Sequence, residues 1–282
     1  MKRKEVQELT GLTRKAIEYY EEKELINPSR DENNYRIYSN SHVEILKKIK
    51  TLRKLGLSVE EITKIIRGEQ ESVGSILRKR EIELGLEDKK FQLLEKLIKA
   101  NDYISIEKEL KLLEKEESIY TKLKERFPGY FGQLMFSSYK PFLKEKIADE
   151  KAFEEYLKFM DSLPPLNLTK EEVESVEKST EVFSMEDLDL ISNEKLKAVE
   201  DVEKWFNENQ EMVKKYEEMK NSQEFKNSTI YKISEKIKTY FIENNYYEIA
   251  IPLIRKFSKS YDKYYMNSIK ASEKFLKMLN ND

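Results

Sequence analysis

The stretch that decides the fold of this chain spans residues 9–30 and reads LTGLTRKAIEYYEEKELINPSR. Its residues 10–12, Thr-Gly-Leu, form a turn signal, because Gly11 adopts a positive φ at little cost. Thr13 follows as a strong helix N-cap, and a helix is expected from there to about Lys23. A turn and a second helix at this spacing predict a helix-turn-helix.

The helices on either side of this turn carry different residues, apolar ones before it and cations after it. Val6 and Leu9 give the segment before the turn one apolar face, which predicts a short first helix. The second helix carries Arg14 and Lys15 at its N-terminal end. A recognition helix meets the major groove with that end, and its dipole favours phosphate there. These two cations are therefore candidates for DNA contact.

The segment after the second helix predicts a small wing and two further helices. Residues 33–39 read NNYRIYS, which predicts a tight β-hairpin with an Asn-Asn turn. We expect Ser41 to cap a third helix that ends near Gly56. Ser58 is expected to cap a fourth helix that ends at Gly68. Short, punctuated elements of this kind indicate a compact N-terminal module.

These segments, together with IKTLRKLGLSVEEITKII at residues 49–66, resemble the MerR family of bacterial transcription regulators. The resemblance runs in unbroken order over about residues 3–68, and the helical stem after it also fits. It implies a winged-helix DNA-binding domain, an antiparallel coiled coil that forms a homodimer, and a C-terminal effector domain. Members of the family bind a pseudo-palindromic operator in a promoter with an overlong spacer. Ligand binding makes the dimer bend and untwist that DNA, so that RNA polymerase can use it.

Carried over position by position, the resemblance implies which residues touch DNA. The second helix and the wing supply most of them, and the end of the third helix supplies two that could reach phosphate. Tyr20 has a second interpretation as a packing residue. The implied DNA-binding residues are Arg14, Lys15, Tyr19, Tyr20, Tyr35, Arg36, Tyr38, Arg53 and Lys54.

Four positions depart from the family pattern, one of them His42, which stands where an acidic residue is frequent. Glu18 stands where an arginine usually precedes the paired tyrosines, and it either repels phosphate or selects a different base. Glu24 replaces a glycine at the end of the second helix, and Asn34 replaces a glycine before the wing. Asparagine tolerates the left-handed conformation, so the hairpin is expected to survive. These departures bear on the operator sequence more than on DNA binding itself.

A long helical segment at residues 71–126 predicts a coiled-coil dimerisation stem. Apolar residues recur there every seven positions along a charged helix, which favours a coiled-coil partner. The residues expected at the dimer interface are Leu77, Leu84, Phe91, Leu94 and Ile98. A second stripe consists of Ile82, Leu86, Leu93 and Leu97. Asn101–Ser105 is a plausible break, and a helix packed on its own domain is the alternative.

The rest of the chain, residues 127–282, predicts an all-α effector-binding domain with 24 of the 31 aromatic residues. Thr169 and Glu172 form a capping-box signal within it. Tyrosine combines an apolar ring with a hydroxyl, which suits an amphipathic organic ligand such as an antibiotic. The alternative is that these rings fill the core. The candidate effector-binding residues are Phe136, Tyr139, Phe142, Trp205, Tyr240, Tyr246, Tyr247, Tyr264 and Tyr265. In length and helical character the region resembles the TipA-like antibiotic-binding domain, without a shared motif.

The residue types present exclude several kinds of chemistry. The chain has no cysteine, so disulfides, thiolate metal sites and iron–sulfur clusters are excluded. His42 is the single histidine, which excludes multi-histidine metal sites. There is no glycine-rich phosphate loop, so we expect no cofactor, no metal site and no enzyme activity. A hydrolase that uses carboxylates alone stays open, because 54 Asp and Glu permit many pairs.

Charge and hydropathy indicate the partners and the compartment. Residues 1–70 hold 15 Lys and Arg against 12 Asp and Glu, a net +3, and the remainder carries −5. This is a modest basic signal that would not justify DNA binding alone. No apolar run approaches about 18 residues, so we expect a cytoplasmic protein without a membrane span.

The sequence therefore predicts a mainly α protein with three parts, at residues 1–70, 71–126 and 127–282. We expect a homodimeric, ligand-responsive MerR-type regulator whose partners are promoter DNA, RNA polymerase and a small organic effector. The alternative is a DNA-binding regulator whose C-terminal domain is a protein-interaction or structural module without a small-molecule ligand.

Overall fold

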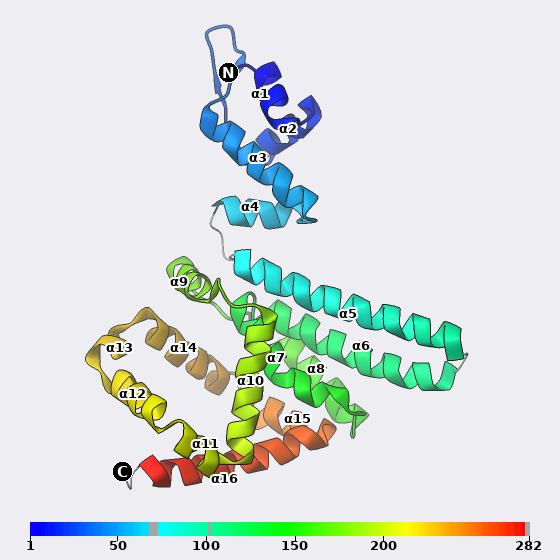
Figure 1. Ribbon diagram of the computed structural model, residues 1–282, viewed down its shortest axis with the longest axis vertical. Coiled ribbons are helices and arrows are strands. Elements are labelled where there is room, and N and C mark those ends of the chain that lie inside the picture. Colours follow the sequence, from blue (N-terminus) through cyan, green and yellow to red (C-terminus); the bar gives the residue numbers. More distant parts are fainter. Residues whose placement is uncertain (68–72, 101–102, 280–282) are drawn as a thin grey trace. The chain divides into compact units, whose positions relative to one another are not determined.

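The computed structural model describes residues 1–67, 73–100 and 103–279, apart from the side chain of Ala100. The chain is mainly α-helical, as expected. Its internal contacts divide it into two units, Met1–Ser72 and Val73–Asp282 (Figure 1). Residues 71–126, expected to form a stem of their own, therefore belong largely to the second unit. We describe each unit by itself.

The N-terminal unit consists of short helices around a small apolar core. Its elements are α1 (Arg3–Thr10), α2 (Arg14–Glu22), β1 (Ser29–Arg30), β2 (Arg36–Ile37), α3 (Asn40–Lys54) and α4 (Val59–Arg67). Helix α3 packs against α1 and α4. The core side chains Val6, Ile17, Leu46, Ile49 and Ile62 are fully buried. Burial of these apolar groups holds α2 at a fixed angle to α3.

The predicted helix boundaries depend on local capping. Gly11 ends α1 with φ +63°, and the Thr13 side chain accepts a hydrogen bond from the Ala16 N–H, so both signals are confirmed. The prediction that Ser41 caps α3 is wrong. Ser39 occupies that position, because its hydroxyl accepts the His42 N–H and the His42 ring accepts the Ser39 N–H.

The start of α4 agrees with the sequence. Ser58 accepts a hydrogen bond from the Glu61 N–H, and the Glu61 carboxylate accepts the Ser58 N–H at 2.8 Å. This reciprocal pair satisfies two donors that a helix N-terminus otherwise leaves free. The expected end at Gly68 lies outside the described residues.

The wing is wider than the predicted Asn-Asn turn. Strands β1 and β2 pair antiparallel with Arg30 opposite Arg36, so a five-residue loop connects them. The carboxylate of Asp31 accepts the N–H groups of Asn33 (3.0 Å) and Tyr35 (2.8 Å). A side chain that bonds the backbone in this way replaces a tight hairpin turn. Within the loop, Asn34 has φ +65°, as its residue type permits.

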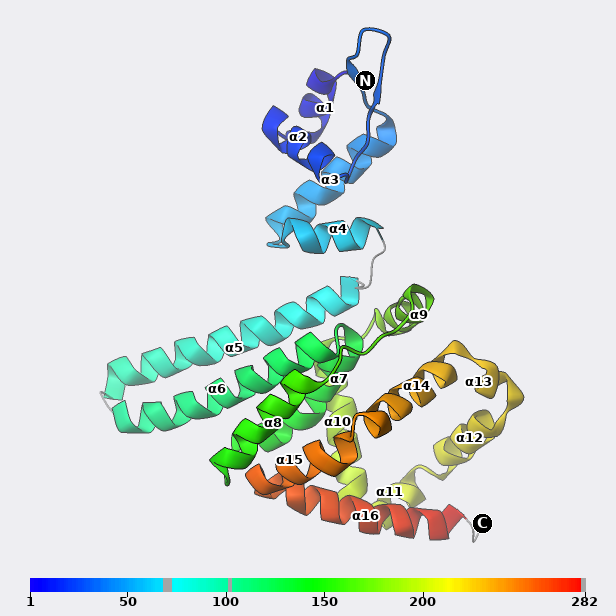
Figure 2. The same ribbon diagram turned by 180° about the vertical axis from the view of Figure 1, so that it is seen from behind.

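The second unit begins with two long helices, α5 (Val73–Ala100) and α6 (Tyr103–Arg126), which lie side by side as a hairpin (Figures 1 and 2). The predicted break at Asn101–Ser105 agrees with these bounds, although Asn101 and Asp102 lie outside the described residues. The second apolar stripe of α5 is the one that packs inward. Its members Ile82, Leu86 and Leu93 are buried in the same core as Leu123 of α6.

Short helices follow the hairpin and complete the unit. They are α7 (Tyr130–Tyr139), η1 (Lys140–Lys144), α8 (Glu150–Ser162), α9 (Lys170–Thr180), α10 (Met185–Glu200), α11 (Val202–Glu208), α12 (Gln210–Asn221), α13 (Gln223–Asn227), α14 (Thr229–Glu243), η2 (Tyr246–Ala250), α15 (Ile251–Phe257) and α16 (Lys259–Leu279). Helix α9 begins with the predicted capping box of Thr169 and Glu172. The described part of residues 127–282 contains no strand, as expected.

One continuous core joins α5–α8, η1, α10, α14, η2, α15 and α16. Helix α6 packs against α7 and α8, and α15 packs against α8 and α16. The core contains Phe127, Phe136, Tyr156 and Phe257, all almost fully buried. In the parts of the chain that the structure describes, no helix is both long and apolar enough to cross a membrane.

Candidate nucleic-acid interface and effector region

Helix α2 presents a polar face that matches most of its predicted DNA contacts. Arg14 and Lys15 are exposed at its N-terminal end, and Tyr19, one turn further on, is 41% exposed. Ile17 and Tyr20 point the other way and are buried. Burial raises the pKa of Tyr20. The structure therefore favours packing over DNA contact for Tyr20.

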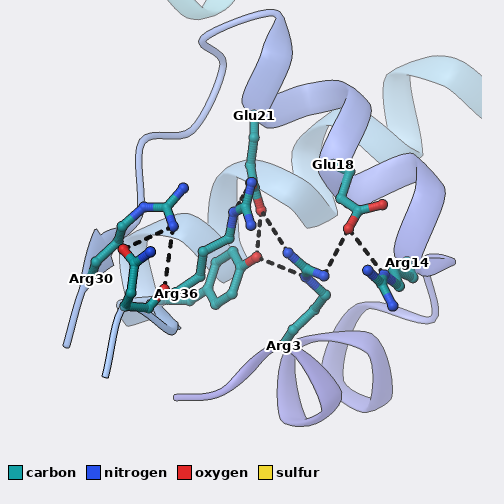
Figure 3. A network of polar contacts seen from close by, with 8 residues as sticks. Arg3, Arg14, Glu18, Glu21, Arg30 and Arg36 are labelled. Atoms are coloured by element: carbon teal, nitrogen blue, oxygen red, sulfur yellow. Dashed lines mark hydrogen bonds and ion pairs between the residues drawn. The ribbon is translucent and has the colours of Figure 1, made fainter. Parts of the chain in front are cut away.

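Glu18 lies between two arginines on this surface (Figure 3). Its carboxylate accepts a hydrogen bond from Arg14 Nε at 3.0 Å and from Arg3 Nη1 at 2.8 Å. The hydrogen bond from Arg14 and the charge of Arg3 lower the pKa of Glu18. The carboxylate that departs from the family pattern thus partly neutralises Arg14 and holds it against the helix.

A second carboxylate, Glu21, connects the wing to α2. Its carboxylate accepts a hydrogen bond from the Tyr38 hydroxyl and forms an ion pair with Arg36. Figure 3 shows both the arginine and the carboxylate. Arg3 Nε donates to the Tyr38 hydroxyl at 3.2 Å, and this hydrogen bond raises the pKa of Arg3. Burial raises the pKa of Tyr38. Arg36 is therefore positioned on the wing by a fixed partner.

The prediction that Tyr38 contacts phosphate is wrong for this structure. Its side chain is only 2% exposed, and its hydroxyl is engaged by Glu21 and Arg3. Tyr38 directly follows β2, and its hydroxyl lies against Glu21 of α2 and Arg3 of α1. Tyr38 instead anchors the wing.

The wing tip and the end of α3 carry the remaining candidates. Tyr35 is 65% exposed at the tip. Arg53 and Lys54 are exposed, and Arg53 Nη1 donates to the Leu57 carbonyl at 2.6 Å. The sequence reasoning missed Arg30, which is exposed and donates to the Asn34 backbone and side-chain oxygens at 3.2 and 3.1 Å. Its position at the end of residues 9–30, directly before the wing loop, is the sequence signal that could have identified it.

Comparison with protein-family models matches residues 1–69 to the MerR HTH family regulatory proteins. The N-terminal unit is a MerR-family helix-turn-helix domain. The MerR domain is 41% identical over 63 residues to the HTH-type transcriptional regulator CueR of Escherichia coli O6:H1, covering 22% of this chain and 47% of that protein. It is 42% identical over 66 residues to the HTH-type transcriptional regulator TnrA of Bacillus subtilis strain 168, covering 23% and 60%. The chain spans about half the length of the curated relatives it matches.

The five residues predicted for dimerisation share one exposed stripe along α5. Leu77, Leu84, Phe91, Leu94 and Ile98 are 53%, 67%, 59%, 52% and 75% exposed in the single chain. Tyr103 and Ile104 extend the apolar surface onto the start of α6, at 66% and 70% exposure. We call these seven residues the stem stripe. Each member of the stem stripe is more than half exposed, in contrast to the buried stripe beside it.

The predicted effector-binding rings mostly fill the core. Phe136, Phe142, Tyr240 and Tyr246 are buried. The hydroxyls of Tyr139 and Tyr246 lie 2.7 Å apart, so they satisfy each other. Among the others, Trp205, Tyr264 and Tyr265 are half-buried and Tyr247 is exposed.

A pocket of about 570 Å³ lies elsewhere in the second unit, between α7, α9 and α14. None of the nine predicted rings is among the described residues that line it. Phe131 lines the pocket whereas Phe136, on the same helix, is in the core. Five residues correspond to a rotation of about 140° on a helix, so the two rings face opposite sides. Aromatic content alone does not reveal which side is hollow.

Proposed function

We propose that this chain is a ligand-responsive MerR-type transcription regulator. It binds a pseudo-palindromic promoter operator as a homodimer and distorts that DNA to control RNA polymerase. The observation that carries the proposal is the MerR domain with Arg14, Lys15 and Tyr19 exposed on its second helix. Arg36 on the wing supplies a further cation at a fixed position. Side chains of these types bind phosphates and base edges in the major groove.

The stem stripe supports the homodimer. An apolar surface that repeats every seven residues along a helix is stabilised by a second helix with the same pattern. Contiguous exposed apolar patches on a soluble chain indicate interaction surfaces. Two copies of α5 in antiparallel arrangement would cover Leu84 and Phe91, which are 67% and 59% exposed. Such a dimer presents two MerR domains to two half-sites.

The control mechanism is a shift between dimer geometries. A ligand that binds one geometry more tightly increases its population, and α5 carries the change towards the MerR domain that precedes it in the chain. Bending and untwisting an operator of this size costs on the order of 1–6 kcal/mol. The differential affinity of the ligand must be of comparable size for a tight switch.

Footprinting on the chain's own upstream region tests this function. We expect protection of two half-sites related by a two-fold axis, with increased cleavage at the distorted centre. Adding the effector is expected to change the central pattern more than the protection at the edges. Absence of protection at low ionic strength, where phosphate contacts are strongest, would contradict DNA regulation at this site.

Arg36→Ala is expected to weaken operator binding about tenfold, because a charge-assisted contact with phosphate is lost. The slope of log affinity against log salt should become shallower by about 0.9 for each subunit. Lys151→Ala removes one exposed cation from the second unit and is the control, with affinity and slope unchanged. Equal affinities and slopes for the wild type and Arg36→Ala would refute the wing contact.

Glu18→Gln is expected to strengthen DNA binding about fivefold, because a unit charge at about 4 Å from phosphate in water is worth about 1 kcal/mol. It also releases Arg14 from an intramolecular ion pair. Glu22 is an exposed residue of the same helix, and Glu22→Gln makes the same charge change. It should strengthen DNA binding less than Glu18→Gln does. Equal effects of both substitutions in an anisotropy titration would mean that net charge, not the Glu18 contact, sets the affinity.

A further inference from the structure

The pocket between α7, α9 and α14 is lined mainly by apolar side chains. Its walls include Phe131 and Leu134 of α7, Val176 of α9, and Ile233 and Phe241 of α14. None of the described lining residues is an Asp, Glu, Lys or Arg. Its volume of about 570 Å³ falls within the range of about 300–1,000 Å³ typical of small-molecule sites. A cavity of this lining is suited to an apolar ligand.

The few polar groups of the lining are already satisfied, with one exception. The hydroxyls of Ser179 and Thr180 both donate to the Val176 carbonyl, at 2.9 and 2.8 Å. Ser234 donates to the Tyr231 carbonyl at 2.7 Å. The hydroxyl of Tyr130, in contrast, has no hydrogen-bond partner among the described residues. The site therefore offers a ligand one hydroxyl group.

A cationic ligand does not fit this pocket. Glu177 is the carboxylate on the α9 turn beside the wall, but it is buried and turned away. It accepts hydrogen bonds from the Ser75 hydroxyl at 2.9 Å and from the Tyr130 N–H at 3.2 Å. Burying a charged ligand without a counter-charge is costly. The lining therefore favours an uncharged ligand.

Arg78 of α5 joins three parts of the pocket wall. Its side chain is fully buried, and Nη1 donates to the carbonyls of Thr180 and Phe183, both at 2.8 Å. Its guanidinium carbon lies 5.5 Å from the centre of the Tyr130 ring. Thr180, Phe183 and Tyr130 all line the pocket. The guanidinium therefore holds the end of α9 and the start of α7 to the second turn of α5.

Gly74 brings the backbone of α5 to the same place. A Cβ atom at this position would lie 2.3 Å from the Glu181 carbonyl oxygen, which no side chain tolerates. The first turn of α5 thus rests directly on the connection between α9 and α10. Helix α5 is also the first described helix after the MerR domain along the chain. A displacement of the pocket wall cannot leave this turn unaffected, because packed elements move together.

We propose that this pocket binds a neutral, mainly apolar organic molecule and that Arg78 transmits its occupancy to the first turns of α5. The proposal rests on the proposed function only for the consequence at DNA. Binding and transmission are properties of the second unit and are measurable on the full chain without DNA.

The neutral fluorescent dye N-phenyl-1-naphthylamine tests the site. We expect saturable binding of one dye per chain, with no displacement by the cation tetraphenylphosphonium. Ser234→Trp places a large ring at the exposed rim of the pocket and should weaken the dye at least tenfold. Thr239→Trp, an exposed position on the same helix that does not line the pocket, should leave affinity within twofold. Absence of saturable binding, equal weakening by both variants, or displacement by the cation overturns the site.

Hydrogen exchange of the full chain tests the transmission. Dye is expected to slow exchange in residues 176–184 and also in residues 73–80 of wild-type protein. In Arg78→Lys, the dye should still protect 176–184, whereas protection of 73–80 should fall by more than half. Protection confined to 176–184 in the wild type overturns the role of Arg78 whether or not the variant folds. A change in oligomeric state of Ser234→Trp would identify the pocket as an interface between copies and would overturn the ligand site.

These measurements separate the two proposals. Dye binding and protection of α5 together with a negative footprint would leave the pocket in place and reject DNA regulation. A positive footprint without dye binding would do the reverse.

Discussion

Phe91→Asp is expected to convert the dimer into a monomer and to weaken operator binding at least 100-fold. Phe91 is 59% exposed in the middle of the stem stripe, so in the proposed dimer it lies between the two stems. A carboxylate there would be buried without a partner, which strongly opposes association. Loss of the dimer removes the avidity of two half-sites, which multiplies affinity by about 10²–10⁴. Sedimentation equilibrium and an anisotropy titration with operator DNA measure the two effects.

The neighbouring position supplies a matched control for this prediction. Gln92 is exposed on the same turn of α5 but lies off the stem stripe. Gln92→Asp adds the same carboxylate and should remain dimeric. The unfolding temperature of each variant at high protein concentration checks its fold. A value within a few degrees of the wild type shows that the fold of the single chain is intact. A dimeric Phe91→Asp protein would exclude the stem stripe as the interface.

Arg78→Met is expected to lower the free energy of unfolding of the second unit by about 3–5 kcal/mol, because removing one member of a buried charged network leaves the other groups unpaired. The Thr180 and Phe183 carbonyls would lose their donor, as would the Gln133 side-chain oxygen, which now accepts from Arg78 Nε at 2.6 Å. Burial lowers the pKa of Arg78, while the charge of Glu177 opposes this shift. Burial thus disfavours the charged guanidinium, and its hydrogen bonds to these partners offset that cost.

Urea denaturation followed by tryptophan fluorescence measures this loss. Trp205 is the single tryptophan of the chain and lies in the second unit, so the signal reports that unit alone. Arg80→Met, two positions along the same helix, removes a partly exposed arginine and should cost less than about 1 kcal/mol. If the two arginine variants unfold at the same urea concentration, the buried network does not stabilise the unit.

Local signals in the MerR domain could be interpreted from sequence because they act over a few residues. Thr13 caps α2 and Gly11 ends α1 as expected, since each cap involves its own turn. The wing turn was not predictable in the same way. Asp31 organises the loop through two backbone N–H groups, and this competes with the Asn-Asn signal next to it. The cap of α3 failed similarly, because Ser39 and Ser41 are both good capping residues and only His42 selects between them.

Contacts between distant segments were beyond the sequence. The pairing of Glu21 with Tyr38 and Arg36 joins residues of α2 and the wing, so an expected DNA contact became an internal anchor. The helical repeat of α5 revealed two apolar stripes but not which one faces α6. The pocket depends on the side from which α9 and α14 approach α7, and no single helix encodes that choice. Aromatic composition therefore did not locate the pocket.

The stem stripe has a consequence for the amount of working protein in a cell. An unpaired subunit would expose a row of apolar side chains, and chaperones and proteases bind such surfaces. Assembly of a pair depends on the square of the subunit concentration while subunits are scarce. A modest rise in synthesis would therefore produce a larger than proportional rise in the concentration of dimers. A newly synthesised chain without a partner would be degraded quickly.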